Sequence, residues 1–346
     1  MSQDLLTNVW YVAALSQQIK KNSFVTRVIQ SEPIVIVRNS DGGLYALRDI
    51  CPHRGIPLSY GRILNGEMEC PYHGWTFDSQ GTCTRIPSVC EGQDLDCRKI
   101  KVKNYPVQEQ QGIVWIFFGD KGFDRSRAPE IPLMKSLPME AKPRIVEIEK
   151  FPCHIDHAVI GLMDPAHGPY VHKSWLWRSE KSAYEKRKRF APVPFGFQMV
   201  RHQPSSNSKA YRLLGGTPTT EITFTLPSVR IEHIQVGNKN VYSFTGLTPV
   251  NEKETIIHQL LYWDMPWMTA ITPFVKKFAQ FFLHQDIDAV AKQQEGLKYD
   301  PSLMLIKDAD TQAKWYFSLK DEWKKHFAET RGFINPVKET ELRWKS

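Results

Sequence analysis

Two short stretches, Cys51-Pro52-His53 and Cys70-Pro71-Tyr72-His73, decide the fold of the N-terminal part of this chain. Together they form a C-x-H…C-x-x-H pattern, with 16 residues between its two halves. Each half offers one thiol and one imidazole, so the halves must meet to complete a site of four ligands. Each pair also needs a loop, because a regular strand points alternate side chains to opposite faces. The sequence therefore predicts two ligand loops carried by a small β-domain.

A two-iron, two-sulfur centre explains why both residue types are present. In a Rieske [2Fe–2S] centre two thiolates hold one iron and two imidazoles hold the other, and the histidines raise the reduction potential. Gly55 and Gly74 follow the ligands and let the backbone approach the inorganic sulfides. The predicted ligands are Cys51, His53, Cys70 and His73. The alternative is a tetrahedral Cys₂His₂ zinc site, but such sites usually pair Cys with Cys and His with His.

A second group of candidate ligands lies in residues 161–172, which contain the pattern D-x-x-H-x₄-H. A ferrous oxygenase needs two imidazoles and one carboxylate on one face of the metal, which leaves positions open for oxygen and substrate. His167 and His172 are the predicted imidazole ligands. Asp164 shares a helical face with His167, which fits a carboxylate that accepts the imidazole N–H.

The carboxylate ligand has to come from elsewhere in the chain. Asp286 and Asp288 are both candidates, and they lie roughly 200° apart around a helix, so only one can face the iron. Four further residues are predicted not to be ligands: His154, Asp156, His157 and His284.

The pattern of elements predicts an α+β chain with two domains. Residues 1–123 are expected to form an all-β domain, with hairpins at 33–48 and 74–86 and a strand at 113–118. Residues 124–143 are rich in proline and charge and are expected to form a linker. Residues 144–346 combine five expected strands (195–200, 219–226, 229–236, 240–248, 255–263) with a loosely helical segment at 158–171 and helices at 267–294 and 310–330.

Composition excludes several other classes of protein. The chain carries 41% hydrophobic and 24% charged residues, which is ordinary for a soluble globular protein. No signal peptide or membrane-spanning segment is visible, so a cytoplasmic location is expected. The net charge of +8 is densest at Lys186-Arg187-Lys188-Arg189, without a nucleic-acid motif. That run is either a solvated face or a docking patch for an acidic electron donor. Four more cysteines are expected to be ordinary thiols: Cys83, Cys90, Cys97 and Cys153.

These motifs resemble the Rieske non-haem iron oxygenases that hydroxylate aromatic rings, in the branch of vanillate and dicamba O-demethylase oxygenases. Residues 8–14 are similar to the N-terminal NxWYVAA signature of that branch, and residues 51–58 and 70–77 match its cluster loops. The resemblance implies that Asp164 is a bridging aspartate, and it selects Asp286 over Asp288 as the iron ligand. One departure is Gly161, where many relatives carry Asn.

The resemblance also implies a mechanism and partners. The implied fold is a Rieske β-domain joined to a helix-grip catalytic domain, assembled as a homotrimer. An NAD(P)H-dependent reductase, with or without a ferredoxin, would reduce the cluster. Electrons would then pass from His73 of one subunit through Asp164 of the next to an Fe(II) ion. Dioxygen would be used there to hydroxylate or oxidatively demethylate a small organic substrate.

The substrate and the exact reaction stay open at this stage. Aromatic side chains near the iron loop and the ligand helix suit a bulky apolar or polycyclic substrate, and they serve equally well as core or interface residues. These are Trp175, Trp177, Trp263, Trp267, Phe274, Phe278, Phe281 and Phe282. Two alternatives are an arene cis-dihydroxylating dioxygenase and a Rieske electron-transfer protein without turnover. A third is a ligand-binding protein that has lost turnover, with Gly161 as its support.

Overall fold

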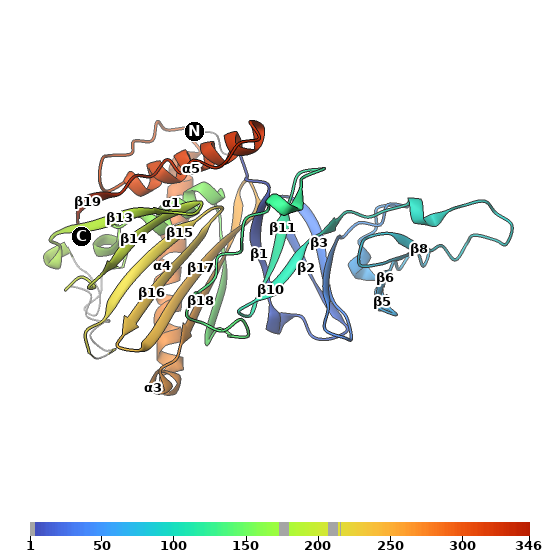
Figure 1. Cartoon of the computed structure of the whole chain (residues 1–346), viewed down its shortest axis with the longest axis horizontal. Helices are drawn as coiled ribbons and strands as arrows, with labels where there is room; N and C mark the ends of the chain where they lie inside the picture. Colours follow the sequence, from blue (N-terminus) through green and yellow to red (C-terminus); the bar gives the residue numbers. More distant parts are fainter. Residues whose placement is uncertain (1–3, 173–179, 207–213, 215) are drawn as a thin grey trace. The chain divides into compact units, whose positions relative to one another are not determined.

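The computed structural model describes residues 4–172, 180–206, 214 and 216–346. The expected aromatic residues Trp175 and Trp177 lie outside the described residues. The chain divides into two compact units, which are coloured from blue to green and from green to red in Figure 1. The first unit contains residues 7–131 and 138–141, and the second contains residues 1–6, 132–137 and 142–346.

The first unit is built from three antiparallel sheets. One has the order β1 (Val9–Leu15), β11 (Ile113–Phe118), β10 (Val107–Gln110), and another the order β2 (Ser23–Ile29), β3 (Glu32–Arg38), β4 (Leu44–Arg48), β9 (Asn104–Tyr105). The third sheet has the order β5 (Arg62–Leu64), β6 (Glu67–Glu69), β7 (Thr76–Phe77), β8 (Cys83–Arg85). Short 3₁₀ turns lie at Ser16–Gln18, Leu58–Tyr60, Cys97–Lys99 and Arg125–Arg127. The expected hairpins and the 113–118 strand are confirmed.

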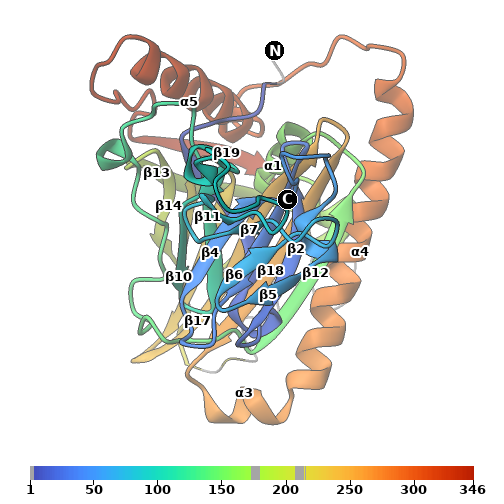
Figure 2. The same cartoon turned by 90° about the vertical axis from the view of Figure 1, so that its right-hand side faces the viewer.

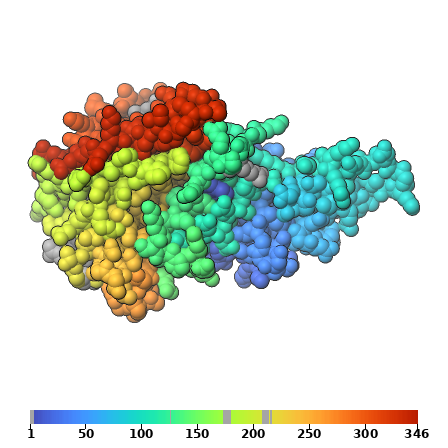
Figure 3. Space-filling model, in the orientation of Figure 1, coloured from blue at the N-terminus to red at the C-terminus, as the bar shows by residue number. Residues whose placement is uncertain are grey.

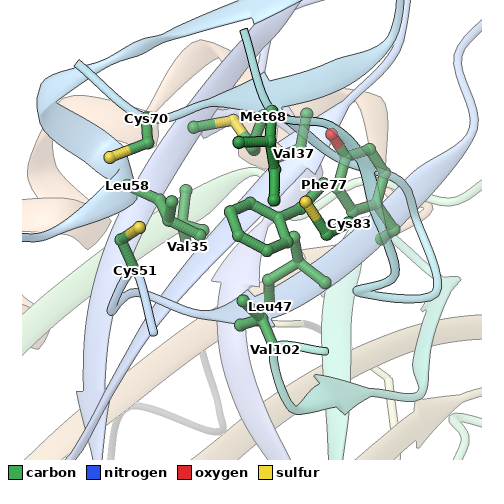
Figure 4. Packing of buried hydrophobic residues seen from close by; sticks show 12 residues of the cluster. Val35, Val37, Leu47, Cys51, Leu58, Met68, Cys70, Phe77, Cys83 and Val102 are labelled. Carbon is green, nitrogen blue, oxygen red and sulfur yellow. The ribbon is translucent and has the colours of Figure 1, made fainter. Parts of the chain in front are cut away.

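The core of this unit lies directly beneath the two ligand loops. Val35 and Val37 of β3 point to one side of the sheet and pack with Leu47 and Phe77. Figure 4 shows Cys51 and Cys70 at one end of this cluster, beside Leu58. The ligand loops are therefore anchored through their cysteines in the apolar interior of the unit.

The second unit contains one sheet of eight antiparallel strands. Its order is β12 (Ile145–Phe151), β18 (Glu254–Trp263), β17 (Lys239–Asn251), β16 (Val229–Val236), β15 (Thr219–Thr225), β14 (Gly196–His202), β13 (Glu185–Val193), β19 (Thr340–Lys345). The five strands expected from the sequence are all present. Each of them combines buried with half-buried residues, and β17 is buried at six consecutive positions, 244–249. The strands β12, β13 and β19 were not predicted.

Within the described residues, five helices accompany the sheet. They are α1 (Ile155–Met163), α2 (Gly168–Val171), α3 (Pro266–Ala270), α4 (Thr272–Leu297) and α5 (Thr311–Ala328), and a 3₁₀ turn lies at Glu180–Ser182. Figure 2 shows α4 running beside β12, with α3 at its lower end. The single helix expected over 267–294 is therefore wrong in its first turns, because Pro273 starts a new helix after Ile271.

Helix α5 packs against β13, β14 and β15, three strands that line the candidate site described below. Trp315 of α5 packs on Phe190 and Phe197, and Tyr316 packs edge-on to Phe224. In the space-filling view the red C-terminal segment, which includes α5, borders the yellow-green strands (Figure 3). This packing gives one face of β13–β15 an aromatic covering.

The segment expected to be a linker contains two buried residues, whereas its other described residues are half-buried or exposed. Ile131 and Met134 are buried, and residues 132–137 group with the second unit whereas residues 138–141 group with the first. Residues 4–6 also group with the second unit, where Asp4 pairs with Lys324 of α5 at 2.8 Å. Among the described residues, no helix has both the length and the apolar character needed to cross a membrane.

Candidate functional site

The two ligand loops of the first unit are copies of one backbone design. In the first, the N–H of Cys51 donates to the carbonyl of Ile56, and the N–H of Gly55 donates back to Cys51. In the second, the N–H of Cys70 donates to Trp75, and the N–H of Gly74 donates back to Cys70. The glycines have φ of +77° and +68°, a region that side chains disfavour. The sequence repeat C-P-x-x-G is thus a repeated turn.

The two histidines of the loops lie next to each other at the surface. The ring centroids of His53 and His73 are 4.5 Å apart, and the ring of Trp75 stacks on His53 at 4.5 Å with an angle of 5°. Tyr72 stacks on His73 at 4.0 Å. These two imidazoles would hold the outer iron of a Rieske cluster, which is the iron with histidine ligands.

The two cysteines occupy the buried end. Burial is the main cause that raises the pKa of Cys51 to about 11, and the neighbouring Cys70 raises it further. Iron would have to displace this proton, because the thiolate is the form that binds metal. A buried thiol pair beside an exposed imidazole pair fits the donor set of a Rieske cluster. Burial likewise raises the pKa of Cys83 to about 11 and of Cys153 to about 12, which describes inert thiols.

In the second unit, the predicted histidines lie at the two ends of the one-turn helix α2. His167 precedes Gly168 and His172 follows Val171, and Pro169 in the first turn permits so short a helix. The two rings meet edge to face, with centroids 4.9 Å apart. Asp286 of α4 completes the group. Ligand atoms of His167, His172 and Asp286 all lie within 4.8 Å of one another.

The orientation of the rings is suited to a metal ion. The Nε2 atoms of His172 and His167 lie 3.0 Å and 3.9 Å from Oδ1 of Asp286. The Nδ1 of His172 lies 3.0 Å from the side-chain oxygen of Gln285. The Nδ1 of His167 is buried and makes no hydrogen bond within the described part of the chain, although Asp164 is 3.7 Å away. The Nε2 atoms of His167 and His172 thus face Asp286, whereas their Nδ1 atoms face away from it.

The side chain of Asp288 points in a different direction from α4 than the side chain of Asp286. Its carboxylate accepts a hydrogen bond from Lys292 at 2.6 Å, one helical turn further on, and it is exposed. Asp286 is instead close to both histidines. The contact of Gln285 with His172 was not predicted from the sequence. The sequence signal that could have indicated this contact was the position of Gln285 directly before the candidate ligand Asp286.

Burial shapes the protonation of this group. Burial lowers the pKa of His167, and Asp164 and Asp286 partly oppose this effect. Burial also raises the pKa of Asp164, whose Oδ1 accepts a hydrogen bond from the N–H of Ala166 at 2.7 Å. A neutral imidazole is the form that binds metal. Two imidazoles and one carboxylate in this arrangement therefore fit a ferrous ion.

A cavity of about 280 Å³ opens beside these residues. Its walls include Phe282 of α4 and, from the sheet, Phe197, Met199, Ile222 and Phe224. A second cavity of about 310 Å³ shares Asp164, His167 and Asp286 with the first. Gly161 lines both, and a Cβ atom added there would meet nothing within 4 Å. Glycine at position 161, where many relatives carry Asn, therefore leaves space beside the candidate metal site.

The structure decides between two alternatives for the aromatic residues and corrects one interpretation of the charged run. Of the expected aromatic wall, Phe282 lines the cavity next to the metal ligands, whereas Trp263 is a core residue and Phe274 is exposed. Trp267 and Phe281 are exposed as well. The run 186–189 is also not one solvated face. It lies in strand β13, so its side chains alternate, and Lys186 is buried.

Comparison with known proteins gives two family matches. Residues 9–106 match the Rieske [2Fe–2S] domain, and residues 152–315 match the vanillate O-demethylase oxygenase C-terminal domain. The chain is 25% identical to protein TIC 55, chloroplastic, of Pisum sativum over 96% of its own length and 58% of the relative's. It is 34% identical to the oxygenase component of dicamba O-demethylase from Stenotrophomonas maltophilia, over 53% of this chain and 51% of that protein.

The solved structures agree on the fold. Dicamba monooxygenase bound to dicamba superposes with a TM-score of 0.73 at 23% identity, over 94% of this chain and 99% of that one. The chain spans about three fifths of the length of the pea relative. The chain therefore combines a Rieske [2Fe–2S] domain with a following α+β domain that matches the C-terminal domain of vanillate O-demethylase oxygenases. Its C-terminal domain is thus similar to that of the vanillate O-demethylase oxygenases, and part of the chain is similar to the dicamba O-demethylase oxygenase.

Proposed function

We propose that this protein is the oxygenase component of a multicomponent Rieske oxygenase, which hydroxylates or oxidatively demethylates an organic molecule with dioxygen. The observation that carries the proposal is the meeting of His167, His172 and Asp286, with both Nε2 atoms turned to the carboxylate. In this proposal these three residues hold an Fe(II) ion. One solved structure of similar fold is dicamba monooxygenase with non-heme iron.

The proposed ligands of the cluster are Cys51, His53, Cys70 and His73. When bound, the cluster would supply single electrons, and the ferrous ion would supply the activation of dioxygen. The protein's own part is to fix these ligands. Gln285 holds the ring of His172 through its Nδ1, and the turns at Gly55 and Gly74 hold the cysteines.

Asp164 is the proposed connection between the two kinds of site. It lies beside His167 and lines the second cavity, whose walls include Leu305. The segment around Leu305 exposes Leu303, Met304 and Ile306. Such an apolar rim suits contact with another protein surface. We propose a homotrimer in which the cluster domain of one subunit docks here, so that electrons from His73 pass through Asp164 to the iron.

The remaining partners follow from this reaction. An NAD(P)H-dependent reductase or a ferredoxin would supply the electrons, because a Rieske cluster takes up single electrons that an external donor has to deliver. A cytoplasmic location stays a prediction, since one relative is chloroplastic and another comes from a bacterium. Monooxygenation is preferred over cis-dihydroxylation because the branch includes a demethylase. The 3-chlorobenzoate dioxygenase subunit among the relatives keeps dihydroxylation as the second candidate.

The test combines metal content with oxygen uptake. An oxygenase should contain about three irons per chain, two in the cluster and one on the histidine and carboxylate ligands. An electron carrier, or a protein that has lost turnover, should contain about two. Oxygen uptake coupled to a substrate panel, with a surrogate reductase, then measures turnover. Two irons and no coupled uptake would overturn the proposal.

A further inference from the structure

One end of the second unit carries large apolar side chains on its outside. Trp267 of α3, Ile271 between the two helices and Phe274 of α4 are 43%, 37% and 77% exposed. They follow one another at intervals of four and three residues, which is the spacing of one helical face. Figures 1 and 2 show α3 at the lower end of α4, beyond the ends of the neighbouring strands. We call these three residues the α3 patch.

The opposite face of the same segment already anchors the helices to the sheet. Met265 and Met268 are buried in a cluster with Trp263 and Ile145, and Val275 packs against that cluster. The segment is therefore held in place without the α3 patch. A helical segment that is apolar on both faces is normally covered on both, so the exposed face calls for a second apolar environment.

Positive charge predominates around the α3 patch. The strands β12 and β17 begin at this end of the sheet, and β18 ends there. The segments that form this end are residues 142–147, 236–240 and 264–277. Together they contain five lysine or arginine residues and two acidic residues. A surface with this excess of cations attracts an anionic partner.

Lys276 and Lys277 place two of these charges directly beside the α3 patch. Both side chains are exposed. The Nζ of Lys276 lies 3.9 Å from a carboxylate oxygen of Glu147, which is a long ion pair, and Lys277 forms no ion pair within the described part of the chain. A lysine stem can lie along apolar surface while its ammonium group stays among polar groups. Both ammonium groups can therefore contact an anionic surface on which the aromatic rings lie.

We infer that the α3 patch docks on an anionic lipid bilayer. Trp267 and Phe274 would enter the headgroup region, and Lys276 and Lys277 would contact lipid phosphates. Aromatic residues beside lysine are typical of helices that lie in a membrane surface, whereas lysine is depleted at protein–protein interfaces. The patch is also distinct from the apolar rim at 303–306 that is proposed above for subunit contact. The 26 residues of α4, about 39 Å of helix, lie between the two.

Flotation of the purified holoprotein with lipid vesicles at low ionic strength tests the inference. One set of vesicles consists of phosphatidylcholine, and the other also contains phosphatidylglycerol. We expect the anionic vesicles to bind the protein at least tenfold more tightly, because each lysine or arginine near an anionic surface strengthens binding about fivefold. Absence of binding to the anionic vesicles, or equal binding to both sets, would overturn the inference.

A matched pair of glutamate variants locates the contact. Phe274→Glu should weaken binding to the anionic vesicles at least tenfold, because it removes an inserted ring and adds a charge that the lipid repels. Ile334→Glu is the control. Ile334 is 66% exposed and lies beside Asn335, which donates to the carbonyls of Val193 and Gly196 at the other end of the sheet. It should keep binding within about twofold, and equal losses in both variants would overturn the inference.

A second pair separates local charge from net charge. Lys277→Gln should weaken binding to the anionic vesicles about fivefold. Lys298→Gln removes the same charge from an exposed position at the other end of α4 and should leave binding unchanged. An equal loss in both variants would show that only the net charge of the protein matters, which would overturn the assignment of the surface.

Sedimentation velocity without lipid tests the competing occupant, a second copy of this chain. We expect Phe274→Glu to sediment like the unmodified protein. A change in its oligomeric state would place the α3 patch between subunits and overturn the inference. Flotation and sedimentation need no turnover, so a failure of the proposed oxygenase function would show only in iron content and oxygen uptake. Circular dichroism checks that each variant is folded.

Discussion

Oδ2 of Asp164 lies 3.7 Å from Nδ1 of His167, on the side of the ring that faces away from Asp286. This gap is slightly longer than a hydrogen bond, and a small ring rotation closes it. Burial raises the pKa of Asp164 and lowers that of His167. Two partly buried groups with opposite shifts are suited to share one N–H hydrogen bond.

Asp164→Asn tests whether this contact matters for electron transfer. The amide is nearly isosteric, so we expect both metal sites and the assembly to remain. An amide is a weaker hydrogen-bond acceptor than a carboxylate. Replacing a residue that holds a metal ligand in place often lowers metal affinity or activity about 10- to 100-fold. The measurement is single-turnover reoxidation of a pre-reduced cluster with oxygen and substrate. Reoxidation at the unmodified rate would show that Asp164 has a purely structural role.

The choice of carboxylate ligand is tested by a matched pair of variants on α4. Asp286→Ala should abolish turnover and lower the mononuclear iron content, because two imidazoles alone bind ferrous iron weakly. Asp288→Ala removes a carboxylate two residues away, which pairs with Lys292 instead, and should leave both unchanged. Iron analysis together with the visible spectrum separates loss of this iron from loss of the cluster. The reverse result would make Asp288 the ligand.

The ligand motifs could be predicted from sequence because their chemistry is local. Cys51 and His53, or His167 and His172, lie within one loop, so their spacing alone limits the geometry. Asp286 was selected by resemblance, and reasoning from the residues left Asp288 open. The cavity wall could not be predicted in this way, since Phe197 and Phe224 become neighbours only through the pairing of β14 with β15.

Strands without an apolar pattern were missed for a related reason. β13 and β19 pair from Glu185↔Lys345 to Phe190↔Thr340, and both are rich in charged residues. Their stability comes from long-range pairing and from the covering helix α5 rather than from local propensity. The run at 186–189 was therefore interpreted as a charged surface, although every second residue faces inward.

The cluster assignment predicts the effect of His73→Ala. Loss of one imidazole should remove the visible absorption and the paramagnetic signal of the cluster, because both ligand types are required. Tyr72→Ala is the control, since it removes only a ring stacked on His73. It should retain the spectrum. A purified His73→Ala protein with a full cluster spectrum would contradict the assignment.

A pH dependence is expected from Glu322 of α5. The hydrogen bond from Arg331 is the main cause that lowers the pKa of Glu322 to about 2. A carboxylate with a lowered folded-state pKa stabilises the protein above about pH 4.5, and this contribution is lost as the pH falls toward 2. Glu322→Gln should therefore lower the melting temperature by about 2–4 °C at pH 7. The difference should shrink at pH 3, and a constant difference would contradict the ionic explanation.

The last prediction concerns the buried pair that joins α1 to α5. Nζ of Lys320 lies 2.6 Å from Oδ1 of Asp156, and both side chains are 3% exposed. Tyr316 donates to the same oxygen at 2.6 Å. Lys320→Met leaves a buried carboxylate without its cation, which costs about 3–5 kcal/mol. Lys324→Met is the control, because its pair with Asp4 is more exposed and is worth about 1 kcal/mol or less. Chemical denaturation measures both variants. Because Asp164 directly follows the last residue of α1, we also expect Lys320→Met to lower mononuclear iron retention. Equal effects of the two substitutions would show that the buried pair does not hold α1 in place.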